Sequence, residues 1–267
     1  MSAGRASRPV VRRLADAETV ARAGAGEWVR LFRAARAKGR RFRVALAGGS
    51  TPRRLYGTLA AEPFAGMWEP AGVDFLFGDE RAVAPDAAES NYRMAREALL
   101  DPVRAPAARV HRMEAERDDL DAAARDYEAS LARVCGTRPR DAGGPPPSLD
   151  LVLLGLGPDG HTASLFPHAP ALRESARWVV AADAPPPPLL PQARRLTVTF
   201  PLLRRAAMVV FLVEGESKAA RLAEVLDGPA DPERLPAQGV APVAGRLVWL
   251  VDRAAASKLV HAPVVDG

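Results

Sequence analysis

Short apolar runs alternate with longer amphipathic stretches along most of the chain. The apolar runs have the length of buried strands, and the stretches between them carry apolar residues at helical spacing. This alternation predicts an α/β protein with a mainly parallel sheet that is flanked by helices on both faces. No stretch has the composition of an interdomain linker, so we expect a flexible N-terminal tail at residues 1–8 and a single domain at residues 9–262.

The same pattern predicts where the individual elements lie. We expect strands at residues 9–14, 43–47, 73–77, 110–113, 151–154, 178–182, 196–200, 208–213 and 247–251. We expect helices at residues 16–38, 91–100, 120–134, 216–226 and 253–260, and another that begins near Pro52. Asp16 and Ser90 are suited to cap the helices that follow them. Either Ser50 or Thr51 is suited to cap the helix at Pro52.

The most informative stretch, residues 149–167, begins as a buried strand and ends in a glycine-rich turn. Glycines let the backbone bend tightly, and ligands of open α/β sheets bind beyond the carboxyl ends of the strands. Asp159 and His161 lie in this turn and are therefore candidates for chemistry rather than packing. A neutral imidazole takes a proton from water near pH 7, so His161 is a candidate general base. Ser164 follows, but no Gly-x-Ser-x-Gly elbow surrounds it, which disfavours a serine-nucleophile hydrolase.

A second glycine turn lies between the predicted strand at residues 43–47 and the helix after it. It contains Gly48, Gly49, Ser50 and Thr51. Backbone N–H groups, the positive end of the helix and two hydroxyl groups together form an anion site in such a turn. The alternative is an ordinary capped turn, but the position directly after a buried strand favours phosphate binding. The turn has neither the Gly-Lys-Ser/Thr of a Walker A loop nor the GxGxxG pattern of dinucleotide-binding proteins.

Charged residues at other predicted strand and helix ends are further candidates. Arg81 offers a planar fork for a phosphate or a developing oxyanion, and Asp79 is suited to orient an imidazole or a sugar hydroxyl. Taken alone, these two residues are also typical of a surface ion pair. Lys218 lies in the first turn of a predicted helix, where its charge opposes the helix dipole, so a bound phosphate would explain it. Arg195 begins a predicted strand, and the sequence does not separate it with certainty from Arg194 as the residue that faces a phosphate.

Composition narrows the possible functions. The chain has 267 residues and a formal net charge of +5, with no long basic run, so we expect no nucleic-acid partner. A modest positive charge suits a small anionic substrate. Cys135 is the only cysteine, which excludes an intrachain disulfide and a zinc site of paired Cys and His ligands. No segment is typical of a secretory signal or a membrane span, so we expect a cytoplasmic protein without a membrane partner.

Several of these segments together resemble the 6-phosphogluconolactonase family of the glucosamine-6-phosphate isomerase/6-phosphogluconolactonase superfamily. The most specific segment is Gly155-Leu-Gly-Pro-Asp-Gly-His-Thr-Ala-Ser-Leu-Phe-Pro167. The other matching segments are residues 47–52, 78–81, 90–92, 195–200, 215–219, 235–237 and 249–255. The resemblance covers residues 10–260 of the chain.

The resemblance implies a Rossmann-like fold of the type shared by glucosamine-6-phosphate deaminase and ribose-5-phosphate isomerase. It implies hydrolysis of 6-phospho-D-glucono-1,5-lactone to 6-phospho-D-gluconate, the second step of the oxidative pentose phosphate pathway, without a metal or a cofactor. His161 would be the general base, assisted by Asp159 or Asp79. The residues expected to hold this small-molecule partner are Gly48, Gly49, Ser50, Thr51, Arg81, Asn91, Arg195 and Lys218. We expect a monomer or a weak homodimer.

Two other functions stay open on the same fold. A sugar-phosphate isomerase or deaminase carries a Glu five residues after the His, where this chain has Phe166, which cannot move protons. A non-enzymatic sugar-phosphate sensor normally carries a DNA-binding helical module, for which we see no room before the first predicted strand. The family often has a His where this chain has Asp86-Ala-Ala-Glu89, so any role of such a His is absent. How far the loop at residues 185–191 covers the site is also open.

Overall fold

The computed structural model describes residues 9–185 and 194–266 of the chain. Its centre is a seven-stranded sheet in which every neighbouring pair of strands is parallel. In spatial order the strands are β10 (Val264–Asp266), β1 (Val10–Leu14), β9 (Arg246–Asp252), β8 (Met208–Val213), β5 (Leu151–Leu154), β2 (Phe42–Leu46) and β3 (Val73–Phe77). The predicted α/β class and the mainly parallel sheet are therefore confirmed. The expected tail at residues 1–8 lies outside the described residues, as does all but Pro185 of the loop expected at residues 185–191.

Continuous apolar runs form the strands in the middle of this sheet. Every residue of β3, β5 and β8 is buried, as parallel strands covered on both faces require. Phe211 on β8 and Trp249 on β9 are register partners, and their rings stack with centroids 3.8 Å apart. The middle strands are thus fixed by packing, and their carboxyl ends offer a rigid edge on which to build a site.

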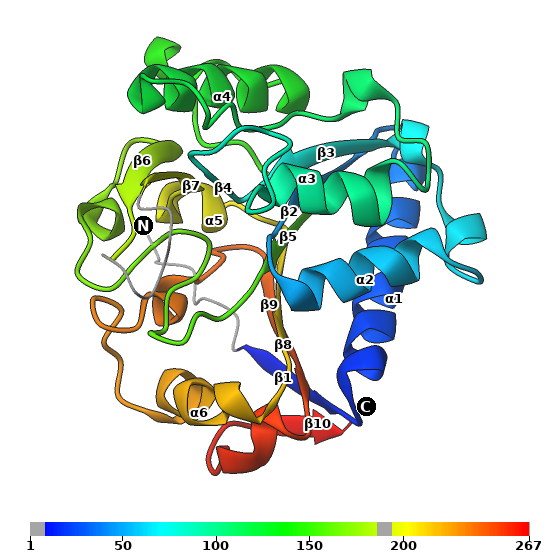
Figure 1. Cartoon of the computed structure of the whole chain (residues 1–267), viewed down its shortest axis with the longest axis vertical. Coiled ribbons are helices and arrows are strands. Elements are labelled where there is room, and N and C mark those ends of the chain that lie inside the picture. Colours follow the sequence, from blue (N-terminus) through cyan, green and yellow to red (C-terminus); the bar gives the residue numbers. More distant parts are fainter. Residues whose placement is uncertain (1–8, 186–193, 267) are drawn as a thin grey trace.

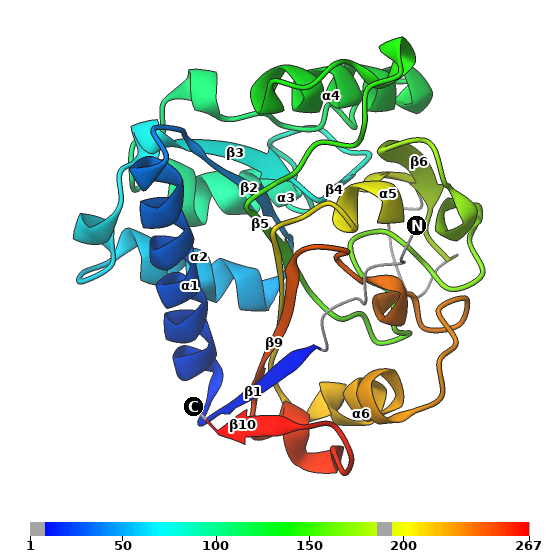
Figure 2. The same ribbon diagram turned by 180° about the vertical axis from the view of Figure 1, so that it is seen from behind.

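Helices lie on both faces of the sheet, as predicted. α1 (Ala17–Ala37) and α2 (Ser50–Ala60) cover one face, and α5 (Phe200–Leu203) and α6 (Ala219–Asp227) lie on the other (Figure 1). Figure 2 shows the same division from behind. α4 (Leu120–Cys135) is hydrogen-bonded to the end of β3 through Tyr127. The Tyr127 hydroxyl donates to the Phe77 carbonyl and accepts from the Phe77 N–H.

The predicted helix starts are confirmed at two positions and wrong at a third. Asp16 caps α1 and Ser90 caps α3 (Asn91–Ala95), each accepting a hydrogen bond from a backbone N–H three residues later. In α2, neither Ser50 nor Thr51 is the cap, because the helix already begins at Ser50 and its N-cap is Gly49. Gly49 has a φ of +104°, a conformation that favours glycine, and no side chain caps the helix there.

A second sheet, which the sequence did not predict, lies on the same side as α5 and α6 (Figure 1). Its three antiparallel strands are, in order, β4 (Asp79–Arg81), β7 (Arg194–Val198) and β6 (Val179–Asp183). β4 is too short to leave a pattern in the sequence. The strand predicted at residues 196–200 is shifted to β7, because the chain turns at Thr199 into α5, whose first turn holds Pro201.

Three further predictions differ from the structure. Of the strand predicted at residues 110–113, only Val110 pairs, in an isolated bridge to Phe75. The helix predicted at residues 216–226 is divided into a 3₁₀ turn, Glu216–Lys218, and α6. The helix predicted at residues 253–260 is a single 3₁₀ turn, because the N–H groups after it bond to a distant carboxylate instead of continuing the helix.

The main sheet continues past the expected domain end at residue 262. β10 pairs in parallel with β1, which places the last described residues at an edge of the sheet. Within residues 9–185 and 194–266, no helix is both long enough and apolar enough to cross a membrane.

Candidate active site

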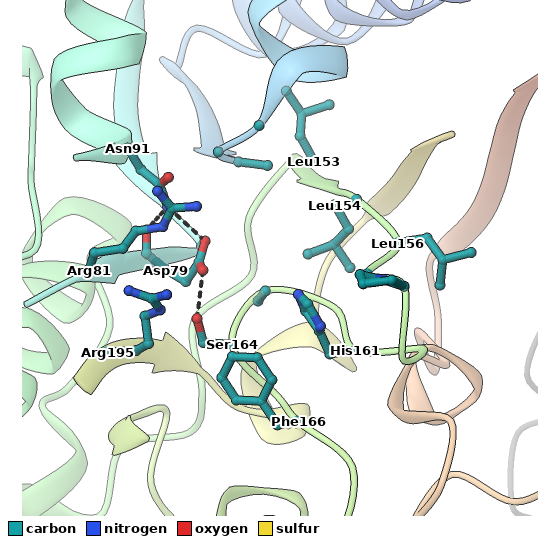
Figure 3. A pocket seen from close by; sticks show the side chains of 18 of the residues that line it. Asp79, Arg81, Asn91, Leu153, Leu154, Leu156, His161, Ser164, Phe166 and Arg195 are labelled. Atoms are coloured by element: carbon teal, nitrogen blue, oxygen red, sulfur yellow. Dashed lines mark hydrogen bonds between the residues drawn. The ribbon is translucent and has the colours of Figure 1, made fainter. Parts of the chain in front are cut away.

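A pocket of about 230 Å³ opens beyond the carboxyl ends of β2, β3 and β5. From β2 the chain proceeds to β3 on one side, and from β5 it proceeds to β8 on the other, so the pocket lies at a switch point in strand order. Its polar side chains are Asp79, Arg81, Asn91, His161, Ser164, Arg195 and Lys218. Figure 3 labels all of these except Lys218. Every one of these except Ser164 was a predicted site residue, and Gly48 and Gly49 line the same pocket.

The turn after β5 presents His161 to the pocket. The Gly157 N–H donates to the His161 carbonyl at 2.8 Å, and the Gly160 N–H donates to the Gly157 carbonyl at 3.1 Å. A side chain at Gly157 would collide with the His161 ring, and Gly160 has a φ of +90°. These two positions therefore need glycine, and the glycine-rich pattern is explained by the path of this turn.

Asp159 is the carboxylate that pairs with His161. Its Oδ1 lies 2.5 Å from His161 Nδ1 and also accepts the His161 backbone N–H at 3.1 Å. Burial raises the pKa of Asp159, but the hydrogen bond and charge of His161 outweigh burial and hold that pKa below its usual value. If Nδ1–H donates to Asp159, Nε2 carries the free lone pair, which is the arrangement of a general base. The His161 ring also packs against Phe166, with ring centroids 4.8 Å apart.

Asp79, the other candidate, belongs to a different network. Its Oδ2 accepts from the Ser164 hydroxyl at 2.7 Å, and its Oδ1 accepts from Asn91 Nδ2 at 3.1 Å (Figure 3). Asn91 Nδ2 also donates to the Asp79 carbonyl at 3.0 Å. Asp79 is therefore held in the wall of the pocket by two polar side chains, whereas the hydrogen bond to the His161 ring comes from Asp159.

Glu80 organises this wall, and the sequence interpretation missed it. The buried Glu80 carboxylate accepts backbone N–H groups of Arg81, Asn91 and Tyr92, each at 2.8 Å, and the Ser90 hydroxyl at 3.1 Å. It thereby ties β4 to the start of α3. Burial raises the pKa of Glu80 despite these donors. The alternation of side chains along a strand could have indicated it. Asp79 and Arg81 face the pocket, so Glu80 between them points to the opposite side of β4.

Two guanidinium groups lie on neighbouring strands of the small sheet. Arg81 and Arg195 are register partners of β4 and β7. Arg195 is 4% exposed, its Nη1 has no hydrogen-bond partner among the described residues, and burial together with the charge of Arg81 lowers its pKa. Arg194 is exposed. The structure therefore identifies Arg195, not Arg194, as the residue in the pocket, and an anion would satisfy its buried charge.

A second cavity adjoins the main pocket, and we call it the anion cradle because the sequence predicts an anion site there. It has a volume of about 130 Å³ and is lined by residues 48–52 at the start of α2, by residues 155–156 after β5, by residues 212–213 at the end of β8, and by Glu214 and Lys218. The Glu214 carboxylate is paired with Arg54, with Arg54 Nε 3.5 Å from Glu214 Oε2. Both cavities share Gly48, Gly49, Gly155, Leu156 and Lys218, so they lie side by side. Burial lowers the pKa of the Lys218 amine, and the charge of Asp159 opposes that shift. The predicted residues Ser50 and Thr51 line only this smaller cavity.

The predicted site residues thus gather at one edge of the sheet, with Asp159 behind His161 rather than in the lining of the pocket. In the described part of the chain, no group of three or more His, Cys, Asp or Glu side chains is arranged to hold a metal ion.

This fold and this site define a family. The chain belongs to the family of glucosamine-6-phosphate isomerases and 6-phosphogluconolactonases, whose sequence profile matches residues 15–249.

Several known proteins that are similar to this chain are 6-phosphogluconolactonases. A 6-phosphogluconolactonase of Synechocystis sp. is 44% identical over 216 residues, which cover 81% of this chain and 84% of the relative. The 6-phosphogluconolactonase of Mycobacterium tuberculosis is 42% identical over 222 residues, with the same coverage of 81% and 84%. The solved structure of 6-phosphogluconolactonase from Trypanosoma brucei has a TM-score of 0.82 and 29% identity, and the match covers 95% of this chain and 99% of that one.

Proposed function

We propose that this chain is an enzyme that hydrolyses 6-phospho-D-glucono-1,5-lactone to 6-phospho-D-gluconate. The printed names of its relatives supply the substrate, and their identity over most of the chain supports the transfer. The observation in the molecule that carries the proposal is the His161–Asp159 pair, which faces a pocket with three cationic side chains. A base such as His161 can activate water for attack on an ester, and the cationic side chains can hold an anionic substrate for that attack. We also propose a cytoplasmic location and a monomer or weak homodimer.

In the proposed mechanism, His161 Nε2 takes a proton from a water molecule as its oxygen attacks the lactone carbonyl carbon. Asp159 holds the ring in the tautomer with Nδ1 protonated and stabilises the imidazolium that forms. The carbonyl oxygen becomes an oxyanion, and each oriented donor that stabilises it is typically worth about 3–4 kcal/mol. As the tetrahedral intermediate collapses, the bond from the carbonyl carbon to the ring oxygen breaks, and His161 returns its proton to that oxygen.

The substrate's phosphate is proposed to lie in the anion cradle. There the first N–H groups of α2, the hydroxyls of Ser50 and Thr51 and the Lys218 amine surround one cavity. The sugar ring then extends from the cradle into the main pocket toward His161. Arg81 and Arg195 supply positive charge to the far wall, and Asn91 and Asp79 offer polar groups to the sugar hydroxyls.

The rival function is sugar-phosphate isomerisation or deamination. That chemistry moves protons on the sugar and needs an additional acid or base close to the ring. Phe166 packs on the His161 ring at the position where the rival enzymes were expected to carry a carboxylate. An apolar ring shields the imidazole but transfers no proton, so lactone hydrolysis is the function that this pocket favours.

The test compares wild-type protein with the variants His161→Ala and His261→Ala. The lactone is generated in solution by oxidation of glucose 6-phosphate, and its loss is followed with the spontaneous rate subtracted. His261 is an exposed residue outside the pocket and serves as the matched control. We expect rapid loss with wild type and the control and near-background loss with His161→Ala. Full activity in His161→Ala would remove His161 as the base, and no activity in folded wild type would overturn the lactonase proposal.

A further inference from the structure

The loop that carries Lys218 leaves the carboxyl end of β8 through Gly215. Gly215 has a φ of +88°, and its carbonyl accepts a hydrogen bond from the Lys218 backbone N–H at 3.1 Å. Gly215 is also the N-cap of the 3₁₀ turn Glu216–Lys218. The conformation at Gly215 therefore decides where this turn begins and from where the Lys218 amine enters the two cavities.

Asp252, the last residue of β9, holds Gly215 in place. Its two carboxylate oxygens accept the Gly215 N–H at 3.1 and 3.0 Å, and Oδ1 also accepts the Ala255 N–H at 2.7 Å. Asp252 is 6% exposed, and its hydrogen bonds within the described residues come from backbone N–H groups. A buried carboxylate is costly unless its oxygens are hydrogen-bonded, so this side chain is committed to the two loops that it joins.

We infer that Asp252 is a positioning residue that holds Lys218 against the substrate's phosphate. The inference rests on the proposed function, because it takes Lys218 as a phosphate ligand. Asp252 is not among the residues that line either cavity, and it acts through Gly215. The His161 turn is held by its own hydrogen bonds and by Arg221 of α6, whose Nε donates to the Pro158 carbonyl at 2.8 Å. Neither depends on Asp252, so we expect the base to stay in place when the Gly215 loop is released. Loss of Asp252 should therefore weaken substrate binding while the chemical step is kept.

The experiment measures KM and kcat for lactone hydrolysis, and by calorimetry the Kd of the product 6-phosphogluconate, in Asp252→Asn and Asp252→Ala. We expect Asp252→Ala to raise KM and Kd about tenfold and to change kcat less than about twofold. Asp252→Asn keeps one acceptor oxygen and should lie between wild type and Asp252→Ala. It also gives a second variant if Asp252→Ala does not fold.

The matched control is Asp227→Ala. Asp252 accepts two backbone N–H groups, and the Asp227 carboxylate accepts three, from Val260, His261 and Ala262, which belong to a segment outside both cavities. The control should leave KM and kcat within about twofold of wild type, because it removes the same kind of contact away from the phosphate. An equal rise in KM in the control would overturn the inference, since any loosened loop would then have the same effect.

A double-mutant cycle separates positioning from general stability. Lys218→Ala should raise KM and Kd by itself, and Asp252→Ala added to it should raise them by less than about twofold further. Multiplicative effects of the two substitutions would overturn the inference, as would a fall in kcat with unchanged Kd. These outcomes require an active wild type. A folded wild type that neither hydrolyses the lactone nor binds 6-phosphogluconate would instead refute the proposed function.

Discussion

The parallel sheet and the small antiparallel sheet contribute to the pocket in different ways. The parallel sheet delivers groups from the turns at its strand ends, where β5 leads to His161 and β2 leads to the turn of Gly48 and Gly49. The antiparallel sheet delivers side chains from within its strands, and its register sets Arg81 opposite Arg195. The parallel sheet therefore supplies the base, backbone donors and the Lys218 amine, and the antiparallel sheet supplies two guanidinium groups on paired strands.

The two contributions are also held in place differently. Glycines and backbone hydrogen bonds fix the His161 turn. The wall formed by β4 depends instead on the buried Glu80 carboxylate and on the bonds that Asp79 accepts. We therefore expect substitutions in the His161 turn to lower kcat, substitutions at Lys218 and Asp252 to raise KM, and substitutions on the antiparallel-sheet side to raise KM or lower stability.

The largest effect is expected at His161. His161→Ala removes the proposed base and should lower kcat by about 10²- to 10⁴-fold, with a much smaller change in KM. The free energy of unfolding, measured in urea, should stay close to that of wild type because the turn is held by its backbone. A KM effect larger than the kcat effect would contradict the assignment of His161 as the base.

The next effect is expected at Arg195. Arg195→Met keeps much of the side-chain volume but removes the charge, and should raise KM about 10- to 100-fold with a smaller change in kcat. Because Arg195 Nη1 has no hydrogen-bond partner within the described residues, the variant should also unfold at an equal or higher temperature than wild type. Arg194→Met, in the exposed neighbour, is the control and should change neither quantity. Equal effects of the two substitutions would remove Arg195 from the binding wall.

Glu80 should affect stability before it affects chemistry. Glu80→Gln replaces one of the two carboxylate oxygens by an amide NH₂. At Oε1 this donor would face the Asn91 N–H, and at Oε2 it would face the Tyr92 N–H, so a donor faces a donor in either orientation. The free energy of unfolding should fall by about 2 kcal/mol, and kcat/KM should fall about tenfold as Arg81 and Asn91 lose their alignment. Glu89→Gln, an exposed site nearby, should be neutral in a urea titration. A Glu80→Gln variant as stable as wild type would show that the wall does not depend on this carboxylate.

The same contrast explains what the sequence was able to predict. β5 and β8 are continuous apolar runs, and the strand ends beyond them carry glycine patterns with a base or an anion site, so that edge of the sheet was predictable. The antiparallel sheet was not, because β4 is short and its pairing with β7 joins segments far apart in the chain. Pairing at such a distance leaves no local periodicity.

Individual residues follow the same division. Asp159 was a candidate partner of His161 because the two are close in sequence, but its preference over Asp79 required coordinates. Arg194 and Arg195 differ only in which face of β7 they occupy, and the sequence did not establish which face is buried. Glu80 was missed because a carboxylate that binds backbone N–H groups has no sequence pattern of its own.

The smallest effect is expected at Ser164, which lies where the two sheets meet. It belongs to the segment after β5, yet its hydroxyl donates to Asp79 on β4 and its N–H donates to the Thr197 hydroxyl on β7. Ser164→Ala removes one of the two side-chain donors to Asp79 and should cost about 1 kcal/mol, seen as a KM raised about fivefold. Ser148→Ala, which removes an exposed hydroxyl bonded to a carbonyl, is the control. If Ser164 were instead the nucleophile, kcat would fall by several orders of magnitude, as for His161→Ala, and the attack by water would be refuted. A rise in KM with kcat preserved would make Ser164 the link that aligns the charged wall with the turn that carries the base.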